Sequence, residues 1–337
     1  MRWLGSVDDV ASVEDFRPYR DRWVLTEVRR YFARPSFPVS VSMSVLAERE
    51  DGGLRWREVN FAAGPGVEGT ATMVLPVSKP AMRGVVLAHS GSDDGRRFFL
   101  SEAAALAAQG AAVILPVMRI RQDEGVDAFA ADVRIAVLIE CAALDVLVEV
   151  GAPPGALSFL GHSAGGAMGA ILSAVEPRLA RIVIFANGAG PLARSAMASG
   201  LSRGAEVTED LAAVADWFDL AHFVGVDRCA QLLIQQGRAD QTVPMAAGRA
   251  LFDAAAQPKL WAEYDWDHGL DADPQARGDR ADFVAGTPPS VPTSGGYTYR
   301  TWRPDRRLLA RHQPSATGSN PSGVVPTSLP NAAAMDP

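Results

Sequence analysis

The sequence predicts an α/β protein built on a mostly parallel sheet of about eight strands, with helices on both faces and a small helical insertion after the sixth strand. Short β-like runs alternate along the chain with longer runs that carry apolar residues at helical spacing. Four of the β-like runs are apolar almost throughout, which is typical of strands buried on both faces. With 337 residues, 48% of them hydrophobic, the chain is long enough to bury a large core.

The first expected elements are a helix and a hairpin. An amphipathic helix is predicted around residues 19–32. Alternating apolar residues predict strands over residues 54–62 and 70–77, separated by the turn-forming sequence Gly-Pro-Gly-Val-Glu-Gly. These two strands are therefore expected to form a half-buried antiparallel hairpin at the start of the sheet.

The central sheet is expected where the apolar runs are continuous. Its four strands are predicted at residues 84–90, 111–118, 156–163 and 181–188. The helical patterns between them cover residues 98–110, 127–150 and 164–176. Two further strands, residues 229–237 and 259–266, flank a helical pattern at residues 243–256.

Two segments depart from this alternation. Residues 189–228 are longer than an ordinary connection and include one or two predicted helices within residues 208–223, so they are a candidate lid or pocket wall. From residue 286 the chain is rich in Pro, Ser, Thr and Gly without periodicity. We therefore expect residues 1–285 to form one domain and residues 286–337 a disordered tail. A docked segment or interaction motif at the basic, aromatic residues 297–313 is the alternative for part of that tail.

Composition and charge exclude several classes of protein. A net charge of −7 offers no broad basic surface for nucleic acid. Acidic residues interrupt the N-terminus before a signal-peptide core can form, and no apolar run is long enough to span a bilayer, so a soluble, cytoplasmic protein is expected. Cys141 and Cys229 lie outside any metal-binding or disulfide pattern, which predicts two buried thiols and no metal site.

A glycine-rich turn holds the candidate nucleophile. Gly161-His162-Ser163-Ala164-Gly165 fits the pattern G-x-S-x-G and lies between a predicted buried strand and a predicted helix. That context can lift a serine hydroxyl out of the end of the sheet, and the helix N-terminus stabilises developing negative charge nearby. By itself the motif also fits a small residue that fills a tight turn.

A nucleophilic serine needs a base, and the base needs a third group that orients it. Asp240 follows the seventh predicted strand and His268 follows the eighth, which is the chain order serine, acid, histidine. The alternative for Asp240 is a helix cap before residues 242–248, and for His268 a surface histidine in a polar turn. Asp265 and Asp267 compete with Asp240 as the acid but lie too close to His268 in sequence to reach its far ring nitrogen easily.

The other histidines are less suitable as the base. Strand alternation directs His162 away from Ser163, His222 lies in the insertion and His312 in the tail. His89 ends the third predicted strand and is expected to shape the loop that follows it. Candidate apolar walls of a substrate pocket, which fit a core role equally well, are Trp217, Phe218 and Trp266.

Two backbone N–H groups are expected to form an oxyanion hole for the tetrahedral intermediate. One is predicted from Ala164, directly after the nucleophile. The second is expected from the loop after the third strand, where either Gly91 or Ser90 can present its amide.

These residues resemble those of serine hydrolases of the α/β-hydrolase superfamily, in the branch of dienelactone-hydrolase-like and acylaminoacyl-peptidase-like esterases. The resemblance covers about residues 50–285 and rests on HSGS at 89–92, GHSAGG at 161–166, GRADQTVP at 237–244 and DHGL at 267–270. Two departures are His-Ser-Gly in place of a His-Gly pair after the third strand, and a serine where dienelactone hydrolases proper have cysteine.

The resemblance implies the α/β-hydrolase fold and hydrolysis of a carboxylic ester, or less readily an amide or thioester, through an acyl-enzyme. It implies a small-molecule ester substrate, no cofactor, and no nucleic-acid or membrane partner, and leaves the oligomeric state open. Two other functions remain: acyl transfer by the same three residues, and a non-catalytic binding protein on the same fold, for which residues 297–313 are the one hint.

Overall fold

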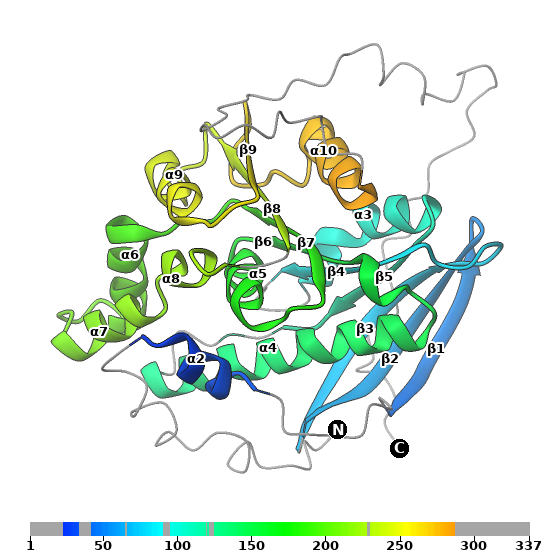
Figure 1. Cartoon of the computed structure of the whole chain (residues 1–337), viewed down its shortest axis with the longest axis horizontal. Coiled ribbons are helices and arrows are strands. Elements are labelled where there is room, and N and C mark those ends of the chain that lie inside the picture. Colours follow the sequence, from blue (N-terminus) through cyan, green and yellow to red (C-terminus); the bar gives the residue numbers. More distant parts are fainter. Residues whose placement is uncertain are drawn as a thin grey trace. The chain divides into compact units, whose positions relative to one another are not determined.

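The computed structural model describes residues 23–33, 42–64, 66–89, 95–118, 120, 125–227 and 230–286. The predicted tail beyond residue 286, with its basic segment, therefore lies outside the described residues. In the described part, nine strands form one sheet in the order β1-β2-β3-β5-β4-β6-β7-β8-β9 (Figure 1). The strands are β1 (Met43–Asp51), β2 (Leu54–Gly64), β3 (Val67–Pro76), β4 (Arg83–His89), β5 (Ala111–Pro116), β6 (Leu157–His162), β7 (Leu179–Phe185), β8 (Gln231–Gly237) and β9 (Lys259–Tyr264).

Helices cover both faces of this sheet, as predicted. The helices are α2 (Leu25–Tyr31), α3 (Arg96–Ala108), α4 (Val126–Glu149), α5 (Ala164–Val175), α6 (Gly190–Ser202), α7 (Glu209–Trp217), α8 (Leu220–Val224), α9 (Met245–Ala254), α10 (Pro274–Ala285) and the 3₁₀ turn η3 (Pro154–Ala156). All eight predicted strands are present. Strands β4 to β9 pair in parallel, whereas β1, β2 and β3 are antiparallel to their neighbours.

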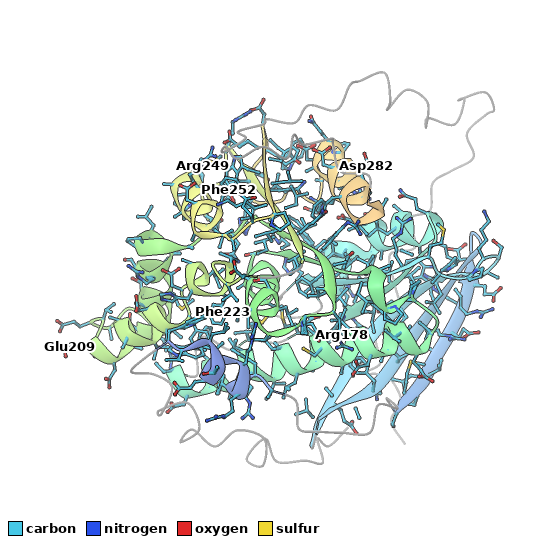
Figure 2. The ribbon with its side chains drawn as sticks, viewed as in Figure 1. Arg178, Glu209, Phe223, Arg249, Phe252 and Asp282 are labelled. Carbon is cyan, nitrogen blue, oxygen red and sulfur yellow. The ribbon has the colours of Figure 1, made fainter. Side chains whose placement is uncertain are left out.

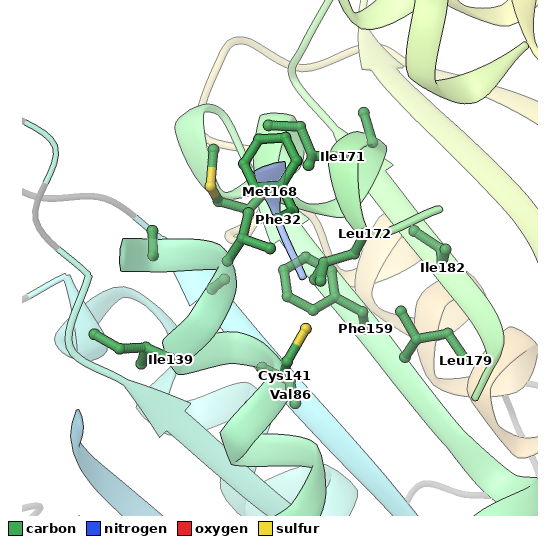
Figure 3. Packing of buried hydrophobic residues seen from close by; sticks show 14 of the residues in the cluster. Phe32, Val86, Ile139, Cys141, Phe159, Met168, Ile171, Leu172, Leu179 and Ile182 are labelled. Atoms are coloured by element: carbon green, nitrogen blue, oxygen red, sulfur yellow. The ribbon is translucent and has the colours of Figure 1, made fainter. Parts of the chain in front are cut away.

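Each face of the sheet has its own hydrophobic core. Neighbouring residues of β4 show the alternation: Val86 packs in the core beneath α4 and α5, and Val85 in the core beneath α3 and α10. Figure 3 shows part of the first core, where Cys141 of α4 belongs to the same cluster as Phe159 of β6 and Leu172 of α5. The strands between the two cores are buried on both sides, which explains their continuous apolar sequence.

Apart from the short turn η3, three elements were not predicted: strand β1, helix α10, and helix α6, which lies before the one or two helices expected within residues 208–223. Strand β1 has no buried residue, so its sequence carries no hydrophobic alternation; it is an edge strand that pairs with β2 and forms ion pairs with it, such as Arg55 to Glu50 at 2.7 Å. Helix α10 buries charged residues, Asp279 and Arg280, together with Phe283, which hides its apolar periodicity. The sheet therefore has nine strands, one more than the eight that the sequence predicts.

The insertion between β7 and β8 consists of three helices, α6, α7 and α8. Asp219 holds its two ends together, because its carboxylate accepts from the Gly190 N–H at 3.0 Å and pairs with Arg194 at 2.8 Å. Figure 2 shows Glu209 at the outer end of α7, whereas Phe223 of α8 is fully buried. Phe223 meets Trp23 edge-on at 5.5 Å, so the insertion is packed onto the N-terminal part of the domain.

Candidate active site

Strand β6 runs directly into helix α5 at Ser163. The serine has φ 51° and ψ −120°, a conformation that non-glycine residues rarely adopt. The glycines on either side make this turn possible: a Cβ on Gly161 would lie 2.2 Å from the carbonyl oxygen of Gly165, and a Cβ on Gly165 would lie 2.0 Å from that of Ala88. The turn is further held by the Asn187 side-chain amide, which donates to the Ser163 carbonyl.

The three residues predicted as nucleophile, base and acid lie together at the carboxyl ends of β6, β9 and β8. His268 Nε2 lies 3.2 Å from Ser163 Oγ, and His268 Nδ1 lies 2.9 Å from Asp240 Oδ2. The Asp240 carboxylate only accepts, so Nδ1 carries the imidazole proton and Nε2 is free to accept from the serine hydroxyl. The geometry suits proton transfer from Ser163 to His268.

Asp240 is held by its own loop. Its Oδ1 accepts from the backbone N–H groups of Thr242 and Val243, each at 2.8 Å, while Gln236 donates to Oδ2 at 3.2 Å. The N-cap position of helix α9 is Pro244, which makes no side-chain capping hydrogen bond, so Asp240 stabilises the turn before that helix and is not its N-cap. Its Oδ2 remains directed at His268.

The two competing carboxylates are engaged elsewhere. Asp265 pairs with Arg238 at 2.6 Å, and Asp267 accepts from the Gly269 N–H at 2.9 Å.

His162 is a site residue that sequence reasoning missed. Alternation separates it from Ser163, but its ring lies 4.9 Å from that of His268, and its Nε2 lies 2.7 Å from the His268 carbonyl oxygen. Burial lowers the pKa of His162 to about 3, so the ring is neutral and its one proton is on Nε2, where the carbonyl accepts it. On its other side the ring stacks on Phe98 at 4.4 Å and on His89 at 4.9 Å. No local sequence signal predicts this bond across 106 residues.

The structure describes one of the residues predicted to form an oxyanion hole. Ala164 is the first residue of α5 and lines the cavity beside Ser163, where its N–H can face a bound carbonyl oxygen. Ser90 and Gly91, the alternatives for the second donor, lie outside the described residues. His89 contacts Phe98 at 4.3 Å at the end of β4.

A cavity of about 210 Å³ opens beside Ser163. Helices α4 and α5 form one side of it, and the insertion adds Met197, Phe218 and Leu220. Trp217, by contrast, is 2% exposed and belongs to the core, and Trp266 is 37% exposed. Of the three candidate wall residues, Phe218 alone is found at this cavity.

The described residues contain neither a candidate metal site nor a membrane-spanning helix. Among them, no three His, Cys, Asp or Glu side chains are grouped so that they could hold a metal ion. Cys141 is a buried cysteine of α4, and Cys229 lies outside the described part. None of the helices in the described ranges is both long and apolar enough to cross a bilayer.

Comparison with known proteins shows the fold. No protein-family model matches the chain, and no curated protein sequence does. Among solved structures, an acetyl xylan esterase from a Paenibacillus species superposes with a TM-score of 0.60 at 16% identity, over 85% of this chain and 99% of that one. Acetyl xylan esterase 1 from a Thermoanaerobacterium species gives 0.55 at 16% identity, over 76% and 88%. A cold-adapted esterase from an Arctic intertidal metagenomic library gives 0.55 at 16%, over 72% and 98%.

The chain has the α/β-hydrolase fold. In this α/β-hydrolase fold the side chains of Ser163, Asp240 and His268 meet at the carboxyl edge of the sheet, the edge at which open α/β sheets bind their ligands.

Proposed function

We propose that the protein is a serine hydrolase that cleaves a carboxylic ester of a small molecule through an acyl-enzyme. The observation that carries this proposal is the hydrogen-bonded series Ser163, His268 and Asp240 beside an open cavity. The solved esterases of the same fold are consistent with it, although at 16% identity they support the fold alone.

In the first half-reaction Ser163 Oγ attacks the ester carbonyl carbon while His268 Nε2 takes the hydroxyl proton. The negative charge on the carbonyl oxygen is stabilised by the Ala164 N–H and a second amide, for which Gly91 or Ser90 is proposed. When the tetrahedral intermediate collapses, the bond to the alcohol oxygen breaks and His268 returns the proton to that oxygen.

In the second half-reaction a water molecule attacks the acyl-enzyme. His268 takes one proton from the water, and the carbonyl oxygen again carries the charge in the oxyanion hole. Collapse releases the carboxylic acid and returns the proton to Ser163 Oγ. Asp240 keeps the imidazole oriented in both halves and stabilises its charged form. An amide or thioester could react in the same way.

A fluorophosphonate probe tests the nucleophile directly. We expect covalent labelling of the wild-type protein, no labelling of Ser163→Ala, and labelling slowed at least 100-fold in His268→Ala. Ser195→Ala is a matched control, because Ser195 is an exposed serine on α6 and its loss should change nothing. Labelling that persists in Ser163→Ala would refute the assignment.

Two other functions lead to different results. An acyltransferase would use the same acyl-enzyme but pass the acyl group to an added alcohol or amine, which product analysis detects. A non-catalytic binding protein would be neither labelled nor active on any ester. The proposal also assigns the enzyme to residues 1–285, with residues 286–337 as a tail, and to the cytoplasm.

A further inference from the structure

The cavity beside Ser163 is apolar. Its lining includes Phe129 and Val133 of α4, Met168 and Ile171 of α5, and Phe218 of the insertion. Apart from Ser163, the one polar side chain at the cavity among the described residues is that of Asn187. A charged group placed there would lose its hydration without gaining a partner, so the described walls favour an uncharged occupant.

The position of the cavity relative to His268 decides which half of an ester enters it. The leaving oxygen must lie next to His268 Nε2, because that atom protonates it. The cavity is lined by Ser163 and Ala164 but by neither His268 nor Asp240. It therefore extends from the side of the nucleophile away from the base, and the group that fills it is the one bonded to the carbonyl carbon.

The volume of the cavity sets the size of that group. An apolar protein cavity of about 150 Å³ accommodates benzene, which has six carbons. A cavity of about 210 Å³ is larger by two-fifths, which corresponds to about six to eight carbons. An acetyl group would leave most of the space unfilled.

We propose that this cavity is the acyl-binding pocket of the enzyme and that it selects uncharged, apolar acyl groups of about six to eight carbons. The inference rests on the proposed function. The insertion contributes to this selectivity, because Met197, Phe218 and Leu220 line the pocket together with residues of α4 and α5.

The test is kcat/KM for p-nitrophenyl esters of straight-chain acids from acetate to dodecanoate. We expect kcat/KM to rise about fourfold for each added methylene, the gain from burying that group, and to peak between hexanoate and octanoate. A p-nitrophenyl hemisuccinate, with a charged acyl group, should react at least tenfold more slowly than the butyrate. A maximum at acetate, a rate independent of acyl length, or equal use of the hemisuccinate would overturn the proposal.

A second series distinguishes the acyl from the alcohol side. Straight-chain alkyl acetates, from ethyl to octyl, vary the leaving group and hold the acyl group constant. Their kcat/KM values should change less than threefold across the series. A steep rise with alcohol length in place of acyl length would show that the cavity holds the alcohol and would refute the orientation.

Substitutions of residues that line the cavity test whether these residues determine the preferred acyl length. Ala167→Leu adds bulk at the cavity and should lower the ratio of kcat/KM for octanoate to kcat/KM for acetate at least tenfold. Met197→Ala should move the optimum to longer chains by one or two methylenes. The matched controls are Ala196→Leu and Leu192→Ala, which make the same kinds of change at exposed positions of α6 and should leave the profile of the wild type unchanged.

Different results would overturn the acyl-binding pocket and the hydrolase. If fluorophosphonate labels Ser163 and esters are cleaved without the expected length profile, the pocket assignment is wrong and the hydrolase stands. If Ser163 is not labelled and no ester is cleaved, the hydrolase and the pocket both fall. An unchanged length profile in Ala167→Leu and Met197→Ala would overturn the pocket assignment alone.

Discussion

His162 and His268 are in contact, and His268 is the one of the two that lies within hydrogen-bonding distance of Ser163 Oγ, at 3.2 Å. The buried His162 ring donates from Nε2 to the His268 carbonyl oxygen at 2.7 Å and so holds the backbone that carries the proposed base. Because burial lowers the His162 pKa to about 3, this donor stays in place across the pH range in which an esterase works. We therefore regard His162 as a positioning residue.

Replacing His162 tests this role. In His162→Phe the ring packing is kept but the His268 carbonyl loses its donor, and a buried carbonyl without a donor costs about 1–3 kcal/mol. We expect kcat/KM to fall about tenfold or more, mainly through kcat, with a folded protein by circular dichroism. His162→Gln keeps a side-chain N–H and should lose less. Equal activity of both variants and the wild type would show that the bond does not position the base.

The site residues differ in how far the sequence predicts them. Ser163, Asp240 and His268 each follow a strand, and parallel strands present their carboxyl ends at one edge, so an ordered set of strands is enough to expect them together. His162 is the last residue of β6, directly before Ser163, and its contact with His268 depends on the path of the chain after β9. That path is part of the tertiary structure, and no periodic pattern in the sequence predicts it.

Helix α5 packs unusually close to the sheet. Gly165 lies against the backbone of β4, and Gly169 lies where a Cβ would meet the Phe159 ring at 3.0 Å. Small residues at these positions let α5 begin directly under Ser163. The same glycines therefore allow α5 to pack closely against the sheet and allow the tight turn that holds Ser163, the proposed nucleophile.

Two glycine substitutions in helices should have opposite effects. Gly165→Ala would place a Cβ 2.0 Å from the Ala88 carbonyl oxygen, and because backbone cannot move aside cheaply we expect a loss of about 3 kcal/mol or more. Gly278→Ala in α10 meets no atom within 4 Å and should stabilise the protein by about 0.5–1 kcal/mol. Urea unfolding measures both. Similar stability of the two variants would contradict the packing argument.

Elements could be predicted wherever one face carries apolar residues at a regular period. Strand β1 and helix α10 fail that condition for opposite reasons, since β1 is exposed and α10 buries charge. For α10 a signal did exist: Asp273 caps the helix by accepting from the Gln275 N–H at 2.8 Å, and Pro274 follows at its first position.

Each of the two hydrophobic cores contains a buried carboxylate, one paired with an arginine and the other not. In the core beneath α3 and α10, the fully buried Arg280 binds both oxygens of Glu102 at 2.8 Å and donates to Gln235 at 3.0 Å, which connects α10, α3 and β8. Glu140 of α4 is also fully buried, yet neither of its carboxylate oxygens has a hydrogen-bond partner among the described residues. The charge of Glu102 is stabilised by Arg280, whereas Glu140 remains uncharged because its carboxyl group keeps its proton.

Glu140 should therefore make the stability of the fold depend on pH. Burial raises its pKa from 4.5 to about 8 in the folded protein, whereas the unfolded chain ionises it near 4.5. Between these two values the folded state holds a proton that the unfolded state releases, so the free energy of unfolding falls as pH rises and levels off above about pH 8.

Glu140→Gln isolates this effect, because the amide has the same shape and does not titrate. We expect the free energy of unfolding of the variant, relative to that of the wild type, to rise by about 3 kcal/mol between pH 5 and pH 8. Asp279, whose pKa burial raises to about 7, lowers the stability of both proteins over the same range and cancels in the difference. Urea unfolding at half-unit pH steps gives the two curves. If they run parallel, Glu140 ionises alike in the folded and unfolded states, and its burial does not control its charge.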